Sequence, residues 1–150
     1  MGSINIVKTI KTVHQSCMVL VKIGTFYHAY SKDAYILSFL FKYKIKKREN
    51  IPEVAFPENS LSRVEAVLEN NKINYLVVDK RNNYQVEYQN ISKQDNNYEK
   101  MFEKAKETIS YIIRIQDIYE NLINSEKDKA LDEKLKRIEE VLKINERRKV

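Results

Sequence analysis

The chain has 150 residues, of which 43% are hydrophobic and 32% are charged. This length suits one domain, or a small domain with an appendage, and supplies enough apolar residues for a packed core. No apolar run approaches the ~18–20 residues needed to span a bilayer, and no secretory signal pattern opens the chain. The single cysteine, Cys17, excludes an internal disulfide. We therefore expect a cytoplasmic protein that makes no membrane contact.

The net charge of +6 is unevenly distributed along the chain. Residues 1–50 contain nine lysines and arginines against two acidic residues. The densest basic cluster consists of Lys42, Lys44, Lys46, Lys47 and Arg48. A basic excess confined to one region is typical of polyanion binding. The alternative is that the basic cluster reflects the overall composition alone, because lysine, isoleucine and asparagine are abundant throughout, as in proteins from AT-rich genomes.

The first forty residues predict two helices around a buried strand. Apolar residues recur at helical spacing within residues 4–14. The β-branched run 18–23 is typical of a buried strand, and Gly24 follows it where the chain needs backbone freedom. Residues 26–41 carry apolar side chains near one helical face and predict a helix that begins at Phe26.

The next part of the chain alternates between strand and helix signals. The pattern of residues 43–46 predicts an edge strand whose lysines discourage unwanted pairing. A short extended piece at 54–56 precedes a helix for which Asn59 or Ser60 offers a cap. Residues 73–79 give the second strong strand signal. Together these elements predict an α/β fold with a mixed sheet and packed helices.

The C-terminal third has a different character. Residues 89–97 are polar and rich in turn-forming residues, which predicts a linker. Beyond it, heptad-like apolar patterns over 102–123 and 131–145 predict a hairpin of two helices. We therefore expect an α/β domain over residues 1–90 and a helical hairpin over residues 91–150.

The apolar faces of this hairpin allow two interpretations. In the one that we favour, they pack on the α/β domain or on each other. In the other, they form a coiled-coil surface for a partner or for a second copy of the chain. Ser125 and Asp128 have the spacing of a capping box, which predicts the start of the second helix.

The sequence carries no signature of an enzyme. With two glycines in total, it cannot build a phosphate-binding loop of the Walker or dinucleotide type. No serine or cysteine lies in a nucleophile motif. His14, Cys17 and His28 loosely suggest a metal site, but a fourth ligand is not evident. We therefore expect a non-catalytic protein that binds no cofactor and no metal.

Two ordered motifs carry a family resemblance. Residues 22–30, Lys-Ile-Gly-Thr-Phe-Tyr-His-Ala-Tyr, follow a strand, and residues 51–57, Ile-Pro-Glu-Val-Ala-Phe-Pro, precede a helix and a final strand. In this order they resemble the first domain of MutS, which recognises mismatches. The resemblance implies that Phe26 is a wedge that stacks on a mispaired base, with Tyr27 beside it. His28 stands where the family has a glutamate that hydrogen-bonds the base, so the permanent carboxylate acceptor is replaced.

A free-standing domain of this kind with a helical extension also resembles the MutS-like accessory proteins of diversity-generating retroelements. Residues 21–28 and 79–84 carry this second likeness. It implies an accessory protein that associates with the reverse transcriptase, with other accessory subunits, and with template RNA, cDNA or duplex DNA. The residues that we predict to bind nucleic acid are Phe26, Tyr27, His28, Lys22, Lys42, Lys44, Lys46, Lys47, Arg48, Lys80 and Arg81.

Two other functions compete with this one. The protein is an adaptor if its hairpin docks the reverse transcriptase without nucleic-acid contact. It is a stand-alone mismatch or branched-DNA binding module if it works outside a retroelement. The C-terminal helices also offer a surface for a homo-oligomer. Exposure of Phe26 beside the lysines favours nucleic-acid binding, and burial of Phe26 favours the adaptor.

Overall fold

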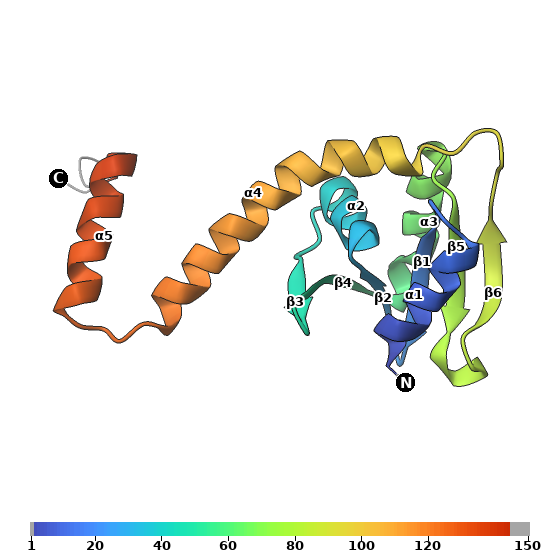
Figure 1. Ribbon diagram of the computed structural model, residues 1–150, viewed down its shortest axis with the longest axis horizontal. Helices are drawn as coiled ribbons and strands as arrows, with labels where there is room; N and C mark the ends of the chain where they lie inside the picture. The colour runs from blue at the N-terminus through green and yellow to red at the C-terminus, as the bar shows by residue number, and fades with distance from the viewer. Residues whose placement is uncertain (1, 145–150) are drawn as a thin grey trace. The chain divides into compact units, whose positions relative to one another are not determined.

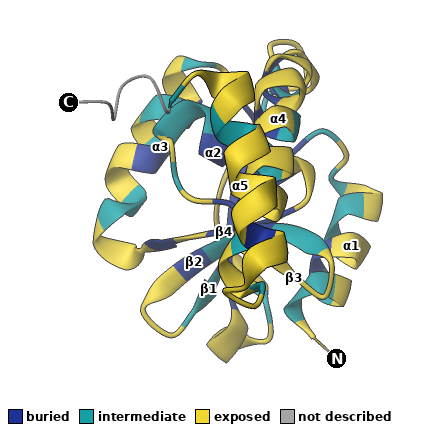
Figure 2. Ribbon diagram, turned by 90° about the vertical axis from the view of Figure 1, so that its left-hand side faces the viewer, coloured by how far each residue is buried: buried dark blue, intermediate teal, exposed yellow. Residues whose placement is uncertain are grey.

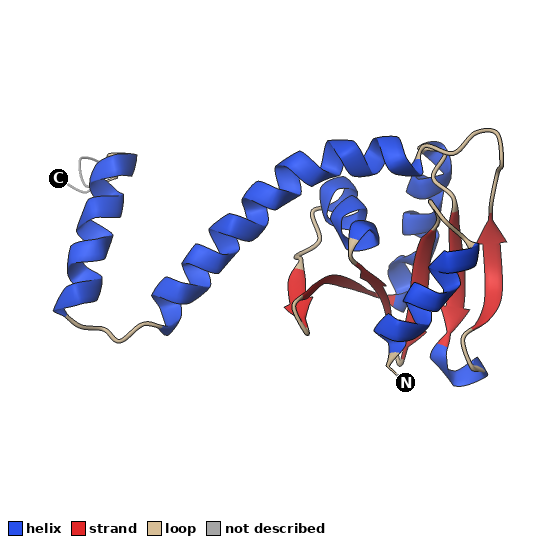
Figure 3. Ribbon diagram, viewed as in Figure 1, coloured by secondary structure: helices blue, strands red, loops and turns tan. Residues whose placement is uncertain are grey.

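The computed structural model describes residues 2–144, and Figures 1 and 3 show its helices and strands. The elements in chain order are α1 (Ser3–Val13), β1 (Met18–Ile23), β2 (Phe26–Tyr30), α2 (Lys32–Phe41), β3 (Lys46–Arg48), β4 (Ile51–Pro57), η1 (Glu58–Ser60), α3 (Leu61–Asn70), β5 (Tyr75–Asp79), η2 (Lys80–Asn82), β6 (Gln85–Asn90), α4 (Tyr98–Asn124) and α5 (Lys129–Leu142). The predicted α/β class with a C-terminal pair of helices is confirmed. Within residues 2–144, none of the helices combines the length and apolar character needed to cross a bilayer.

A mixed sheet of six strands forms the centre of the fold. Its strand order is β3-β4-β2-β1-β5-β6. β1 and β5 run parallel, and the other neighbouring pairs are antiparallel. Strands in the middle of a sheet with both faces covered are nearly continuously apolar. This explains why β1 and β5 gave the strongest strand signals, since all of β5 and the first four residues of β1 are buried.

Different helices cover the two faces of the sheet. On one face, Val7 of α1 packs with Val21 of β1 and Val78 of β5. On the other face, α2 contacts β2 and β4. α3 also lies on this second face, where the Tyr75 hydroxyl donates a hydrogen bond to Glu69 at 2.7 Å. We call these surfaces the α1 face and the α2–α3 face.

The helix predicted over residues 26–41 is wrong at its start. Phe26–Tyr30 forms β2, which pairs with β1 on one side and with β4 on the other, and α2 begins only at Lys32. Gly24 has a φ of 63°, which permits the tight turn between β1 and β2. Aromatic side chains favour a strand that is paired on both sides. This pairing overrides the helical spacing of the apolar residues.

Three smaller boundaries also differ from the predictions. The edge strand expected at residues 43–46 lies at Lys46–Arg48, and the linker expected to begin at residue 89 begins after Asn90. β6 was not predicted, because it carries only two apolar residues, Val86 and Tyr88, among polar and mostly exposed neighbours. The second helix of the pair also starts later than the capping box predicted. Asp128 rather than Ser125 caps α5, since the Asp128 side chain accepts a hydrogen bond from the backbone N–H of Leu131, whereas the Ser125 hydroxyl donates to the carbonyl of Asn121.

A buried carboxylate joins four elements at the end of the sheet where β1 begins. Asp33 of α2 is fully buried, and its Oδ1 accepts hydrogen bonds from the Lys11 ammonium at 2.6 Å and the Tyr98 hydroxyl at 2.5 Å. Its Oδ2 accepts from the backbone N–H of Val19 at 3.0 Å. Burial, and then the Asp33 charge, raise the pKa of Cys17 to about 12 and raise the pKa of Tyr98 well above its usual range. The network therefore links α1, β1, α2 and α4.

The chain divides into two compact units, Met1–Tyr111 and Ile112–Val150, so the division falls within α4. The residues of α4 that are buried in the first unit are Tyr98, Met101, Ala105 and Ile109. The domain boundary predicted after residue 90 stays a prediction. The burial of Tyr98 argues for a boundary later in the chain.

The second unit contains the end of α4 and all of α5. Most residues of α5 are exposed, as Figure 2 shows. The large apolar side chains of this unit that are exposed are Ile112, Ile115, Ile118, Tyr119, Ile123, Leu135, Val141 and Leu142. The last position of the predicted apolar pattern, Asn145, lies outside the described residues.

We predict that a chain ending at Tyr111 keeps the fold of the first unit and that a chain ending at Asn90 does not. The shorter chain lacks Tyr98, and loss of a buried aromatic side chain alone costs about 3–5 kcal/mol. A small domain has only about 5–15 kcal/mol of stability in total. Thermal unfolding followed by circular dichroism compares the two chains. Equal melting temperatures would show that residues 1–90 fold independently, as the sequence suggested.

Candidate nucleic-acid interface

A patch of the α1 face lies over β2 and β4. Phe26 and His28 of β2 pair with Pro57 and Ala55 of β4, respectively. Directly paired residues point to the same side of a sheet, so these four side chains form one surface. Phe26 is 44% exposed, Ala55 and Pro57 are exposed, and His28 is partly exposed. We call this surface the β2–β4 patch.

Lys22 and Tyr27 lie on the opposite face of the sheet. They are paired with each other across β1 and β2. The Tyr27 ring is buried and stacks on Phe56, with ring centroids 5.6 Å apart. The Lys22 ammonium lies 3.1 Å from the Glu58 carboxylate, whose hydrogen bond raises the pKa of Lys22. The structure therefore does not bring these two predicted residues into the β2–β4 patch.

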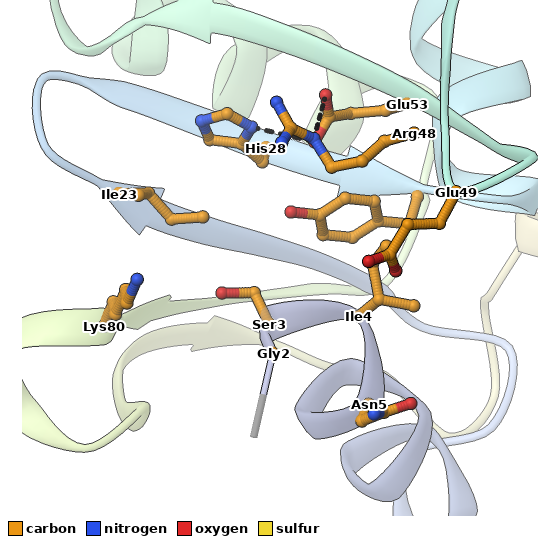
Figure 4. A pocket seen from close by; sticks show the side chains of 11 residues that line it. Gly2, Ser3, Ile4, Asn5, Ile23, His28, Arg48, Glu49, Glu53 and Lys80 are labelled. Carbon is orange, nitrogen blue, oxygen red and sulfur yellow. Dashed lines mark hydrogen bonds and ion pairs between the residues drawn. The ribbon is translucent and has the colours of Figure 1, made fainter.

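A cleft of about 450 Å³ borders the β2–β4 patch, and Figure 4 shows the side chains around it. The residues that line it are Gly2, Ser3, Ile4, Asn5, Ile23, His28, Tyr30, Arg48, Glu49, Glu53 and Lys80. Its walls thus come from the first turn of α1, from β1, β2, β3 and β4, from the β3–β4 turn and from η2. The first turn of α1 contains no acidic residue, so the positive end of the helix dipole adds to the charges of Arg48 and Lys80. We call this the α1 cleft.

Glu53 is the centre of the polar contacts in the α1 cleft. Its side chain is nearly buried, and its Oε1 accepts a hydrogen bond from Arg48 Nε at 3.2 Å. Its Oε2 lies 3.1 Å from His28 Nδ1. Burial and then the Glu53 charge raise the pKa of Tyr30, and the hydrogen bond to Glu53 raises the pKa of Arg48. One carboxylate therefore organises a histidine, an arginine and a tyrosine.

The predicted basic cluster is spread along one edge of the sheet. Lys42 ends α2 in a left-handed conformation, Lys44 follows in the loop, and both are exposed. Lys46, Lys47 and Arg48 form β3, which is the edge strand of the sheet. Of the five, Arg48 alone lines the α1 cleft.

Lys80 and Arg81 differ in their electrostatic surroundings. Lys80 is exposed and lines the α1 cleft. Because β1 and β5 are parallel, Lys80 lies at the end of the sheet where Phe26 pairs with Ile23. Arg81 instead contacts Asp79, whose carboxylate accepts a hydrogen bond from the Arg81 backbone N–H at 2.8 Å. This hydrogen bond, together with the guanidinium, lowers the pKa of Asp79.

A comparison with protein families assigns the first unit. The family model described as MutS domain I matches residues 1–94 of the 150-residue chain. The chain belongs to the MutS domain I family. Residues 1–94 are therefore a module of the mismatch-recognition type, and the family resemblance inferred from two short motifs is confirmed. Among curated proteins, none matches the chain.

Sequence reasoning on this MutS domain I missed Glu53. The residue lies in the second motif, but His28 precedes it by 25 positions, and only the pairing of β2 with β4 brings the two together. The signal in the sequence was an acidic residue within an otherwise apolar strand, because a buried carboxylate requires hydrogen-bonding partners. The predicted roles of the binding residues stay predictions.

We predict that changing Lys42, Lys44 and Lys46 to glutamine weakens nucleic-acid binding at all sequences and flattens its salt dependence. Each lost phosphate contact lowers the slope of log affinity against log salt by about 0.7–0.9. A salt titration of affinity for a duplex with one unpaired base measures the slope. The control changes three exposed lysines elsewhere, Lys93, Lys104 and Lys106, to glutamine. Equal slopes in the two triple variants would show that the edge lysines contact no phosphate.

Proposed function

We propose that this MutS domain I protein is a non-catalytic accessory protein of a diversity-generating retroelement. In this role it binds unpaired or distorted nucleic acid through the β2–β4 patch, and it associates with the reverse transcriptase and its template RNA or cDNA. The observation that carries the proposal is the exposure of Phe26 beside the α1 cleft. The family match supports DNA binding, and the likeness of residues 21–28 and 79–84 to retroelement accessory proteins supports the retroelement role.

The position of Phe26 suits contact with bases. Its neighbour in the motif, Tyr27, is buried, whereas 44% of the Phe26 surface meets solvent. Exposed aromatic rings stack on unpaired bases, and apolar side chains act as wedges between the base pairs of bent duplexes. Arg48 and Lys80, which line the adjoining cleft, are suited to contact the phosphates on either side of such a base.

We predict that Phe26→Ala lowers affinity for nucleic acid with an unpaired base by about 5- to 150-fold, the effect of losing one aromatic stacking contact. The same change should reduce stability by far less than the ~3–5 kcal/mol typical of a core phenylalanine. Fluorescence anisotropy measures the affinity, and thermal unfolding measures the stability. Phe26→Trp should preserve binding, because it keeps an aromatic surface.

The matched control for this experiment is Tyr88→Ala. Tyr88 is an aromatic residue of β6 with a similar exposure of 47%. Its loss should leave affinity unchanged. If Phe26→Ala unfolds the protein while its remaining folded fraction binds normally, Phe26 is a core residue and its role as the stacking residue is wrong.

A second candidate function is protein docking, and the exposed apolar residues of α4 favour it. Ile115, Ile118 and Tyr119 are each more than half exposed in the distal part of this helix. Exposed apolar surface of this kind marks interaction sites. The occupant that we propose is the reverse transcriptase of the same retroelement, and docking by this helix is compatible with nucleic-acid binding by the first unit.

We predict that Ile115→Glu combined with Ile118→Glu abolishes capture of the reverse transcriptase and leaves nucleic-acid affinity unchanged. Glutamate is a good helix former, so the change removes apolar surface without breaking α4. Co-purification from the native host measures capture. Asn121→Glu is the control, because it adds charge to the same helix and removes no apolar side chain. If the double variant still captures the reverse transcriptase but has a lower mass in solution than the unmodified protein, this surface is a homo-oligomer contact.

A further inference from the structure

The two ring nitrogens of His28 lie in different environments. Nδ1 is 3.1 Å from Oε2 of Glu53, and Figure 4 shows the other ring nitrogen directed away from that carboxylate. The imidazole is 16% exposed and lines the α1 cleft. Its ring also stacks on Tyr30, with centroids 6.5 Å apart and an angle of 20° between the planes. These contacts hold the ring in one orientation.

The contact with Glu53 determines which nitrogen carries the proton. An ionised carboxylate only accepts hydrogen bonds, so Nδ1 must donate. Arg48 donates to the other oxygen of the same carboxylate at 3.2 Å, so each Glu53 oxygen has its own partner. In a neutral imidazole whose Nδ1 carries the proton, Nε2 has a free lone pair and accepts hydrogen bonds.

We propose that Glu53 fixes His28 in this form, so that Nε2 accepts a hydrogen bond from an N–H group of an unpaired base stacked on Phe26. This inference rests on the proposed function. His28 is then the residue that contacts the base, and Glu53 is a positioning residue that acts through it. Two residues of this chain would together supply the acceptor that one glutamate supplies in the resembling motif.

The β2–β4 patch has room for such a base. Phe26 and His28 are alternate residues of β2 and point to the same face. The residue paired with His28 is Ala55, which is small and exposed. A base stacked on the Phe26 ring can therefore turn its edge toward the His28 imidazole without meeting a large side chain of β4.

The first test examines the tautomer in the free, full-length protein. Nitrogen NMR of protein with labelled histidine, recorded at about pH 8, shows which ring nitrogen carries the proton. The chain has two histidines, so a His14→Gln variant identifies the His28 signals. We expect a protonated Nδ1 and a bare Nε2. A protonated Nε2 in the unmodified protein would overturn the proposal.

Glu53→Gln makes this test sharper. Arg48 can only donate hydrogen bonds, so in Glu53→Gln it should keep the amide oxygen of the new side chain as its acceptor. The amide N–H₂ should then face His28. Nδ1 must then accept, and the proton moves to Nε2. We therefore expect the tautomer to reverse in Glu53→Gln. It should be unchanged in Glu87→Gln, where the altered carboxylate is exposed on β6.

The second test measures selectivity for base N–H groups. The probes are duplexes with one unpaired base, compared in two pairs: thymine with N3-methylthymine, and adenine with purine that lacks the amino group. We expect the unmodified protein to prefer the N–H-bearing member of at least one pair by about 2- to 12-fold, the effect of one hydrogen bond. His28→Phe and Glu53→Gln should both lose this preference, and Glu87→Gln should keep it.

The outcomes separate this inference from the function on which it rests. If the unmodified protein binds none of the probes, the proposed function fails at the level of nucleic-acid binding. If it binds them without preference, or if either variant keeps the preference, the Glu53–His28 inference is wrong while nucleic-acid binding stands. Thermal unfolding of each variant confirms that selectivity is compared between folded proteins.

Discussion

The Asp33 carboxylate holds together the elements on which the candidate site depends. It is fully buried and accepts hydrogen bonds from Lys11, Tyr98 and the backbone of Val19. A buried charge with this set of donors is stable, whereas removal of one partner leaves polar groups without compensation. Asp33 also lies in the first turn of α2, where the helix dipole favours a negative charge. The position of α1 relative to the sheet is fixed at this point.

That anchor determines where the α1 cleft lies. Lys11 is in the last turn of α1, and the first turn of the same helix lines the cleft. A helix of 11 residues is about 16 Å long, so one end of α1 is held at the start of β1 while the other end reaches the turn between β1 and β2. The helix packs over β1 and β5 along this length, and the surface of β2 and β4 stays open beside it.

The open patch is supported from behind by a column of aromatic rings. On the α2–α3 face, Tyr27 stacks on Phe56, Phe56 on Tyr43, and Tyr43 on Phe41, with centroid separations of 5.6, 5.7 and 5.3 Å. Stacked aromatic pairs contribute about 0.5–1.5 kcal/mol each beyond their buried area. β2 and β4 are thus held by the side chains on their other face. Phe26 is not among the buried residues of this core, although it lies in a strand that is paired on both sides.

Local patterns predicted the parts of the fold that depend on local interactions. β1 and β5 gave clear signals because strands in the middle of a covered sheet are apolar throughout. β2 was assigned to a helix because its apolar spacing fits a helix. It forms a strand because it pairs with β1 on one side and with β4 on the other. β6 is an exposed edge strand, and the alternation of its two apolar residues, Val86 and Tyr88, is too short to stand out from the polar sequence around it.

The candidate site was predictable only where a single short motif carries it. Phe26 was identified because the Phe-Tyr-His motif is contiguous in sequence. The partner of His28 was not, since Glu53 is brought to it by the pairing of β2 with β4. The basic residues were identified by type but not by place. Of the cluster from Lys42 to Arg48, the last residue alone lines the cleft, and it is held there by the same glutamate.

The Glu53–His28 pair has an electrostatic consequence for binding a polyanion. A glutamate in direct contact with the nucleobase would place a fixed negative charge near the phosphates. Two like charges ~5 Å apart repel by about 0.8 kcal/mol even in water. In this chain the carboxylate is nearly buried and its charge is balanced by Arg48. In the proposed arrangement, the group presented to the cleft is the lone pair of His28 Nε2, which accepts a hydrogen bond without adding a negative charge beside the phosphates. Under the proposed function, His28 offers the base a hydrogen-bond acceptor, as the family's glutamate does, and leaves the positive potential of the first third of the chain intact.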